Sequence, residues 1–187
     1  MSAIPASQPE RDNVWQEVRG RLHSTLNDQT FSFAFAGARA VELTADAFKA
    51  DLSRETLALT TAGQWQPGSA VNLEKALTAG QSLGGHYVTG HVDGVGEVVA
   101  RHEDARSVRV EFEVPAELAR YVARKGSVCV DGVSLTVNGV AGARFDVNLV
   151  PHTLERTILG DYRPGTRVNL EVDIIARYLE RLLAEGR

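Results

Sequence analysis

Hydrophobic residues alternate with polar or small residues over many short stretches of this chain, which is the period of β-strands. Turn residues such as the pair Pro67-Gly68 separate these stretches. Many short strands at regular spacing are typical of a sandwich or a barrel, so the pattern predicts an all-β fold. The predicted strands cover residues 30–35, 48–52, 56–59, 70–73, 95–100, 108–114, 128–130, 135–140, 145–150 and 167–172.

Three stretches have the spacing of helices instead. Residues 14–22 form one, although Gly20 weakens it, and residues 115–124 form another with a proline in the first turn. In the last segment Asp173 is a suitable N-cap. Its apolar side chains share one helix face opposite the charges: Ile174, Ile175, Tyr178, Leu179, Leu182 and Leu183. That face can pack on the chain's own barrel or on copies of itself, and the sequence favours neither.

An internal repeat divides the chain. Residues 52–74 align without a gap with residues 149–171, at an offset of 97 residues, and both segments end in Val-Asn-Leu-Glu. Such a match indicates duplication of one module. The predicted organisation is a disordered tail at 1–13, an N-terminal module at 14–80, a C-terminal module at 81–172 and a terminal helix at 173–187.

Composition narrows the possible partners. The chain has 187 residues, 43% of them hydrophobic, which is enough for a buried core. Its net charge of -4 and the absence of a long basic run argue against nucleic acid or an anionic membrane as a partner. No segment has the length of a membrane span, and residues 1–11 lack the apolar core of a signal peptide, so a cytoplasmic location is expected. The single cysteine, Cys129, excludes an intramolecular disulfide and a cysteine zinc cluster, and no metal site is predicted.

The stretch Gly84 to Gly96, GGHYVTGHVDGVG, places His86 and His91 among glycines near the middle of the chain. Glycine lets the backbone turn sharply and approach a ligand, and imidazole can exchange protons near neutral pH. The stretch is therefore a hinge between the modules, a site, or both. We expect it to form the first strand of the second module.

Four motifs resemble a known family: GGHYVTGHVDGVGEV, KGSVCVDGVSLTV, LVPHTLERTIL and GTRVNLEVD. In this order they resemble riboflavin synthase of the alpha-chain type and the related lumazine-binding proteins. The resemblance implies two tandem Greek-key β-barrels, the first one degenerate here, and a C-terminal helix that assembles a homotrimer. It also implies dismutation of two molecules of 6,7-dimethyl-8-ribityllumazine to riboflavin and 5-amino-6-ribitylaminopyrimidinedione, without a cofactor or metal. The family's site lies between the first barrel of one subunit and the second barrel of its neighbour.

The resemblance also implies roles for individual residues. His91, Ser134 and Asp173 match catalytic positions, whereas His86 is expected to stabilise a turn. Without the family, His91 would be read as a structural histidine and Lys125 as a solvated lysine, and Asp173 can also cap the helix. Positions that match contacts to the pteridine or flavin ligand are Gly90, Val92, Lys125, Leu135, Thr136, Asn148, Leu149, Val150, Pro151, His152 and Thr153 in the second module, and Asp51, Leu52, Ser53, Arg54, Glu55 and Thr56 in the first.

The first module departs from the family. It begins MSAIPASQPE instead of Met-Phe-Thr-Gly, and Gly37-Ala38-Arg39-Ala40 replaces a Gly-Val-Cys-Leu-Thr-Val strand. In the second module His152 stands where the family usually has glutamate. Two hypotheses follow: a riboflavin synthase with a diverged first barrel, or a paralogue that binds lumazine or flavin without making riboflavin.

Overall fold

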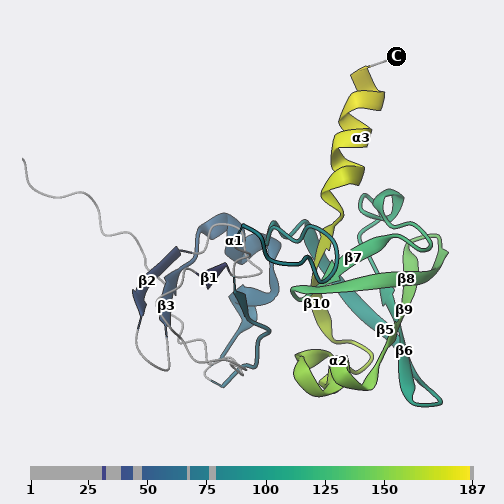
Figure 1. Cartoon of the computed structure of the whole chain (residues 1–187), viewed down its shortest axis with the longest axis horizontal. Coiled ribbons are helices and arrows are strands. Elements are labelled where there is room, and N and C mark those ends of the chain that lie inside the picture. The colour runs from purple at the N-terminus through teal and green to yellow at the C-terminus, as the bar shows by residue number, and fades with distance from the viewer. Residues whose placement is uncertain (1–30, 33–38, 44–47, 67, 76–78, 186–187) are drawn as a thin grey trace, which may run out of the picture.

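Six antiparallel strands close into a barrel in the C-terminal half of the chain, in the order β10-β5-β6-β9-β8-β7 (Figure 1). The computed structural model describes residues 31–32, 39–43, 48–66, 68–75 and 79–185. Within them the barrel strands are β5 (Gly94–Asp104), β6 (Ser107–Glu113), β7 (Ser127–Val130), β8 (Val133–Ala141), β9 (Arg144–Leu149) and β10 (Arg167–Val172). These match the six predicted strands of the second half, so the all-β prediction is confirmed for this barrel.

The barrel is filled by side chains that alternate with outward-facing ones along each strand, as the period of two requires. Valines from four different strands are fully buried inside it: Val98, Val110, Val137 and Val168. Phe112 and Phe145 stack with their ring centroids 5.1 Å apart, and Tyr162 meets Phe112 edge-on at 6.1 Å. This aromatic group closes one part of the core, because such pairs bury large apolar areas.

The N-terminal half contains two short ladders among its described residues. Strand β1 (Phe31–Ser32) pairs with β4 (Glu74–Lys75), and β2 (Arg39–Leu43) pairs with β3 (Phe48–Asp51). Helix α1 (Arg54–Leu59) and the 3₁₀ helix η1 (Thr61–Gln64) follow β3. The predicted tail at 1–13 and helix at 14–22 lie outside the described residues, and a first barrel stays a prediction.

The same local structure occurs twice, 97 residues apart. Helix α2 (Pro151–Arg156) and η3 (Ile158–Asp161) occupy the positions that correspond to α1 and η1. Thr60 accepts from the backbone N of Ala62 at 3.1 Å and donates to Thr56 O at 2.6 Å. Its counterpart Thr157 does the same, from the N of Leu159 at 3.2 Å and to Thr153 O at 2.7 Å. In both halves this threonine ends the α-helix and begins the 3₁₀ turn.

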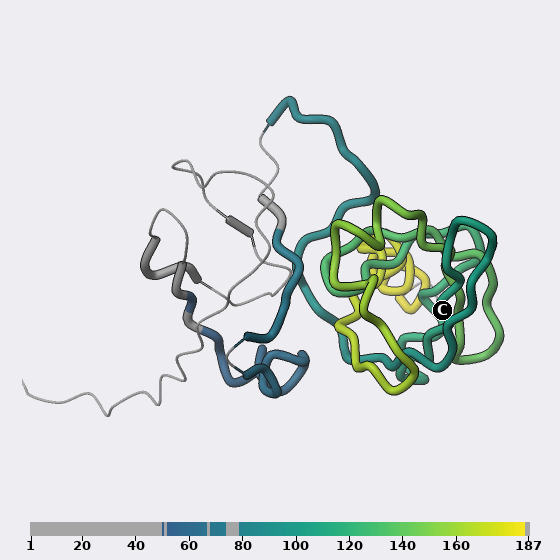
Figure 2. The backbone as a smooth tube through the Cα atoms, turned by 90° about the horizontal axis from the view of Figure 1, so that it is seen from below, coloured from purple at the N-terminus to yellow at the C-terminus, as the bar shows by residue number. Residues whose placement is uncertain are grey.

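The two halves are joined by a crossed pair of asparagines. Asn72 Oδ1 accepts from the backbone N of Ile158 at 2.9 Å, and Asn169 Oδ1 accepts from the backbone N of Thr61 at 2.7 Å. Asn72 corresponds to Asn169, and Thr61 to Ile158, so each asparagine binds the 3₁₀ turn of the other half. Figure 2 shows the barrel as a ring, with the segment that carries α1 and η1 outside it.

Asp131 extends this junction. Its backbone O accepts from Asn72 Nδ2 at 2.8 Å. Its buried carboxylate accepts from Tyr162 Oη at 2.6 Å, from Asn169 N at 2.8 Å and from Asn169 Nδ2 at 2.9 Å. With φ of 44° at Asp131 and 80° at Gly132, the pair forms the turn between β7 and β8.

Four predicted elements were wrong. Residues 56–59 belong to α1 rather than a strand, because Ser53 Oγ accepts from Thr56 N at 3.0 Å and caps a helix there. Residues 70–73 are not a strand, and the ladder begins only at Glu74. Of the helix predicted at 115–124 only the 3₁₀ turn η2 (Ala119–Tyr121) forms, since Leu118 N bonds Pro115 O three residues back. The stretch 84–93 is not a strand, and β5 begins at Gly94.

Helix α3 (Ile174–Glu185) projects away from the barrel (Figure 1). As predicted, Asp173 caps it, accepting from Ile175 N at 3.0 Å. Its charged side faces the barrel: Glu180 bonds the Tyr121 hydroxyl and lies 2.6 Å from Arg120. Its apolar residues Ile175, Tyr178, Leu179, Leu182 and Leu183 are 53 to 71% exposed, so they do not pack on the chain's own barrel. None of the described helices has the length and apolar character of a membrane span.

Candidate functional site

His86 and Ser134 are in direct contact on the outside of the barrel. The loop that precedes β5 crosses β8, and His86 Nδ1 lies 2.7 Å from Ser134 Oγ. The backbone N of His86 donates to the same oxygen at 3.3 Å. A Cβ on Gly85 would stand 2.7 Å from Ser134 Cβ, so this approach requires glycine. The contact places an imidazole and a hydroxyl together in a half-buried position.

The environment of His86 keeps its ring neutral. Partial burial lowers the pKa of His86 below its ordinary value, and the charges of Asp173 and Glu171 oppose this shift only in part. Since unperturbed histidine titrates near pH 6.5, the ring is uncharged at about pH 7. Nε2 is buried and has no hydrogen-bond partner among the described residues. When Nδ1–H donates to Ser134, an assignment made from this hydrogen-bond pattern, Nε2 is free to accept a proton.

Two carboxylates hold the loop that carries both histidines. Glu171 on β10 accepts from Thr89 N at 2.7 Å, from Thr89 Oγ1 at 2.8 Å and from Gly90 N at 3.0 Å. Asp93 accepts from Val172 N at 2.7 Å and pairs with Arg177 of α3. The loop is thereby tied to the junction of β10 and α3.

The predicted residues of β8 and β9 divide into outward and inward positions. Ser134, Thr136 and Asn148 lie on the outer face. Val137 of β8 pairs with Val147 of β9, and next to this pair Thr136 precedes Val137 and Asn148 follows Val147. Leu135 and Leu149 are buried in the core, which leaves only their backbone groups for a ligand. The outer face of these strand ends is therefore polar and continues the line of Ser134.

The remaining predicted residues of the second module lie around this face. Lys125 is exposed at a turn with φ of 66°, and its N donates to Val137 O at 2.9 Å. Gly90 is buried with φ of 79°, His91 is exposed, and Val92 is half-buried. After β9, the exposed Val150, Pro151 and His152 and the half-buried Thr153 turn into α2, with Val150 as its N-cap.

Comparisons with known proteins identify the family of this chain. The sequence pattern of the lumazine binding domain matches residues 20–76 and again residues 89–173. The chain belongs to the riboflavin synthase and lumazine-binding family. It is 49% identical over 143 residues to riboflavin synthase of Photobacterium phosphoreum, covering 76% of this chain and 66% of that protein. It is 52% identical over 139 residues to that of Mycobacterium tuberculosis (strain ATCC 25618 / H37Rv), covering 73% and 69%. With the Bacillus subtilis (strain 168) enzyme the identity is 37% over 142 residues, covering 76% and 66%.

Solved structures show the same fold. LumP complexed with 6,7-dimethyl-8-(1'-D-ribityl) lumazine superposes with a TM-score of 0.67 at 22% identity, covering 77% of each chain. LumP complexed with riboflavin gives 0.67 at 24% identity, covering 72% of this chain and 73% of that one. At this identity the likeness concerns the fold. The matched region spans about two thirds of the length of the riboflavin synthases named above.

Among the first-module candidates, Ser53 and Thr56 have local structural tasks. Ser53 caps α1, and its hydroxyl also lies 2.9 Å from the buried Thr56 Oγ1. Arg54 and Glu55 are exposed, and Leu52 is half-buried. Asp51 ends β3.

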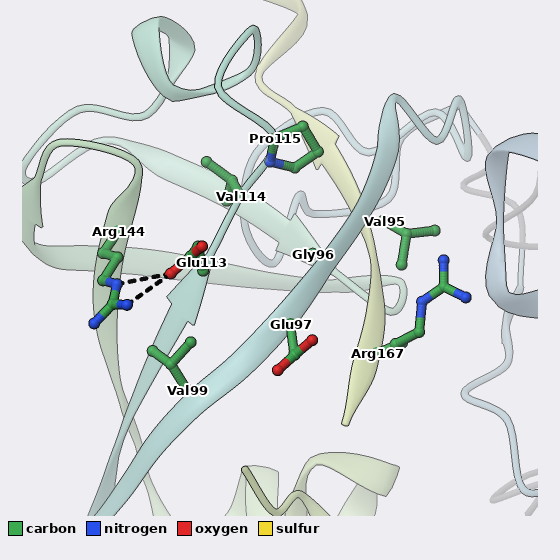
Figure 3. A pocket seen from close by; sticks show the side chains of 9 residues that line it. All are labelled: Val95, Gly96, Glu97, Val99, Glu113, Val114, Pro115, Arg144 and Arg167. Carbon is green, nitrogen blue, oxygen red and sulfur yellow. Dashed lines mark hydrogen bonds and ion pairs between the residues drawn. The ribbon is translucent and has the colours of Figure 1, made fainter. Parts of the chain in front are cut away.

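A separate hollow of about 490 Å³ lies on the outer side of β5 and β6 (Figure 3). Charged side chains from four strands border it, and Arg144 pairs with Glu113 at 2.8 Å. None of the predicted site residues contributes to its lining, which consists of Val95, Gly96, Glu97, Val99, Glu113, Val114, Pro115, Arg144 and Arg167. The hollow is open and its ion pair is already formed, so the His86–Ser134 contact is the candidate site taken forward.

Sequence reasoning missed three parts of this site. His86 was expected to stabilise a turn, and its contact with Ser134 depends on a loop crossing a strand 48 residues away. Glu171 and Asp93 were not proposed, because nothing in their spacing connects them to the histidine loop. The recurring Val-Asn-Leu-Glu motif was the available signal for Glu171, since a glutamate in a strand buried on both faces needs a partner.

Proposed function

We propose that this chain is a riboflavin synthase, which converts two molecules of 6,7-dimethyl-8-ribityllumazine to riboflavin and 5-amino-6-ribitylaminopyrimidinedione. The observation that supports this most directly is the His86–Ser134 pair, set among outward-facing residues at the positions implied by the family. The relatives that share 37 to 52% of the matched residues carry this activity in their names.

The pair suits the first chemical requirement of this reaction. One lumazine must lose a proton from an acidic methyl group before it can attack the other, and a neutral imidazole is a suitable base. His86 is the base in this proposal, and its contact with Ser134 Oγ orients the imidazole and stabilises the charged ring. Positioning of two flat substrates against each other supplies much of the remaining rate, because it turns an encounter into a reaction within one complex.

The second substrate is bound by a neighbouring subunit in our proposal, and α3 assembles the trimer. The supporting observation is the orientation of that helix: its charged side binds its own barrel through Glu180 and Arg177, and its apolar stripe is left exposed. An exposed stripe of five large apolar residues is a typical helix-packing surface.

Turnover of pure protein tests the proposal. Purified chain incubated with 6,7-dimethyl-8-ribityllumazine should produce riboflavin, measured by its absorbance and fluorescence against a protein-free blank. His86→Gln should reduce the rate strongly while the fold persists. Equal rates in the blank and with folded wild-type protein would refute the synthase assignment.

A second function, binding of lumazine or flavin without turnover, is supported by the first module. There Gly37-Ala38-Arg39-Ala40 replaces the strand that supplies half of the family's composite site. In that case a fluorescence titration would show tight lumazine binding while riboflavin formation stayed at the level of the blank. Absence of binding to both ligands would exclude this function too.

A further inference from the structure

Glu171 is an unusual buried carboxylate, because all of its hydrogen bonds go to one loop. Its side chain is 5% exposed and receives three bonds, two from Thr89 and one from Gly90. No described cation pairs with it. A buried carboxylate is costly unless its oxygens are satisfied, so the loop must hold this position for the barrel to tolerate the charge. In return, three charge-assisted bonds fix the loop with little freedom.

The same loop has a second attachment four residues further on. Asp93 N donates to Leu170 O at 2.8 Å, and its carboxylate binds Val172 N and Arg177. The loop is therefore attached to β10 at both Thr89–Gly90 and Asp93, and Arg177 joins it to α3. Upstream, the next contact of the loop is His86 on Ser134.

We propose that Glu171 is a positioning residue, whose bonds to Thr89 and Gly90 set the placement of His86 against Ser134. The effect on catalysis rests on the proposed function, whereas the effect on the placement of His86 does not. His86 is three residues from Thr89, and few backbone torsions separate them. A loop released from Glu171 would let His86 leave the half-buried contact, and a displacement of about 1 Å at a reacting group can cost up to about 100-fold in rate.

If Glu171 had only a structural or only an electrostatic role, the pKa of His86 would respond differently to its replacement. The groups that face His86 are Ser134 from β8, Glu171 from β10 and Asp173 after it. Burial is the largest influence and lowers the pKa of His86, whereas the charge of Glu171 raises it. Loss of charge alone would lower the pKa further. Release of the loop would remove the burial, and the pKa would rise toward its ordinary value.

Thr89→Val separates these effects, because it removes one bond to Glu171 without changing any charge. Thr89 is exposed, so the variant should fold. Glu171→Gln is the stronger perturbation: it removes the charge and turns an amide NH₂ toward the N–H of Gly90 or Thr89. Glu97→Gln on the outer face of β5 controls for loss of one negative charge, and Phe112→Leu in the core controls for lower stability.

The experiment follows the His86 imidazole resonance by NMR across pH, identified by its absence in His86→Gln. We expect the pKa of His86 to rise in Thr89→Val and Glu171→Gln and to stay unchanged in both controls. Riboflavin formation should fall a few-fold in the first variant and about 10- to 100-fold in the second, mostly in kcat. If Glu171→Gln does not fold, the pKa of His86 and the rate of riboflavin formation in Thr89→Val test the proposal by themselves.

An unchanged pKa in Thr89→Val, or a lowered pKa in a folded Glu171→Gln, would overturn the proposal. So would a rate loss no larger than that of Phe112→Leu. If wild-type protein makes no riboflavin, the NMR titration still decides the positioning role, and only the proposed function fails.

Discussion

Replacing Asn169 with alanine should destabilise the fold strongly, because this buried side chain joins the two halves. It accepts from Thr61 N at 2.7 Å and donates to Thr61 Oγ1 and to Asp131 Oδ1, both at 2.9 Å. A neutral hydrogen bond contributes about 1 kcal/mol and one to a charged group about 1.5 to 3 kcal/mol. With the orphaned Thr61 N–H added, the expected loss is about 3 to 5 kcal/mol of unfolding free energy.

Urea unfolding followed by circular dichroism measures this loss, with the m-value checking that one transition is observed. Asn72→Ala should cost less, about 1 to 3 kcal/mol, because Asn72 is only half-buried and its bonds to Ile158 and Asp131 involve neutral groups. Asn148→Ala is the matched control: its exposed side chain should contribute under about 0.5 kcal/mol. A loss below about 1 kcal/mol for Asn169→Ala would refute the reasoning, since a bonded buried amide cannot be removed so cheaply.

Three further predictions concern the site, the junction and the helix. Ser134→Ala should lower riboflavin formation by about 10- to 100-fold while lumazine affinity, measured by fluorescence titration, changes much less, because the hydroxyl orients the base. Burial raises the pKa of Asp131 in the folded state, so its contribution to stability is complete below the unfolded pKa of about 4 and is lost as pH rises through the folded pKa. Between the unfolded and the folded pKa of Asp131, the melting temperature of wild type should therefore fall with rising pH relative to that of Asp131→Asn. Melting temperatures of the two proteins that change in parallel with pH would contradict a raised pKa of Asp131. Leu182→Glu places a charge in the exposed stripe and should convert the proposed trimer to monomers in light scattering, with an unchanged barrel spectrum. A mass equal to that of wild type would exclude the helix as the assembly surface.

The fold could be predicted best where the strand pattern was least ambiguous. In the second half, β-branched residues alternate with polar ones over five or more positions, and β6, β9 and β10 formed as expected. The strand predicted at 56–59 was wrong because Thr-Leu-Ala-Leu suits a helix as well as a strand, and the cap from Ser53 favours the helix. The helix predicted at 115–124 was wrong although a helical pattern was present, because the backbone there bonds at a spacing of three residues and forms only the 3₁₀ turn at 119–121.

The site was predictable as a set of segments but not as a set of contacts. The motifs pointed to Ser134, and the alternation along β8 places it outward, as observed. Which histidine meets it depends on the path of a glycine-rich loop that has no periodicity. The motifs indicated His91 as a ligand-site residue, which stays a prediction, whereas the contact of His86 with Ser134 was not predicted. The difference arises because Glu171 and Asp93 bend the loop back to β10, and neither contact is encoded by local spacing.

The junction also bears on why the segment Leu52 to Thr56 resembles its counterpart in the second half. Ser53 caps α1, and Thr56 O receives the hydroxyl of Thr60 that begins η1. The N–H of Thr61 in that turn is the group that Asn169 binds. Of these residues Thr56 recurs as Thr153, and the backbone O of each accepts the hydroxyl of the threonine that begins the 3₁₀ turn, whereas Val150 and Ile158 replace Ser53 and Thr61 in the second half. The turn itself therefore accounts for the recurring Thr56, and a pteridine contact in the first half is tested by Glu55→Gln, whose exposed side chain has no part in the junction: lumazine affinity in a fluorescence titration should fall if the contact exists and stay unchanged if it does not.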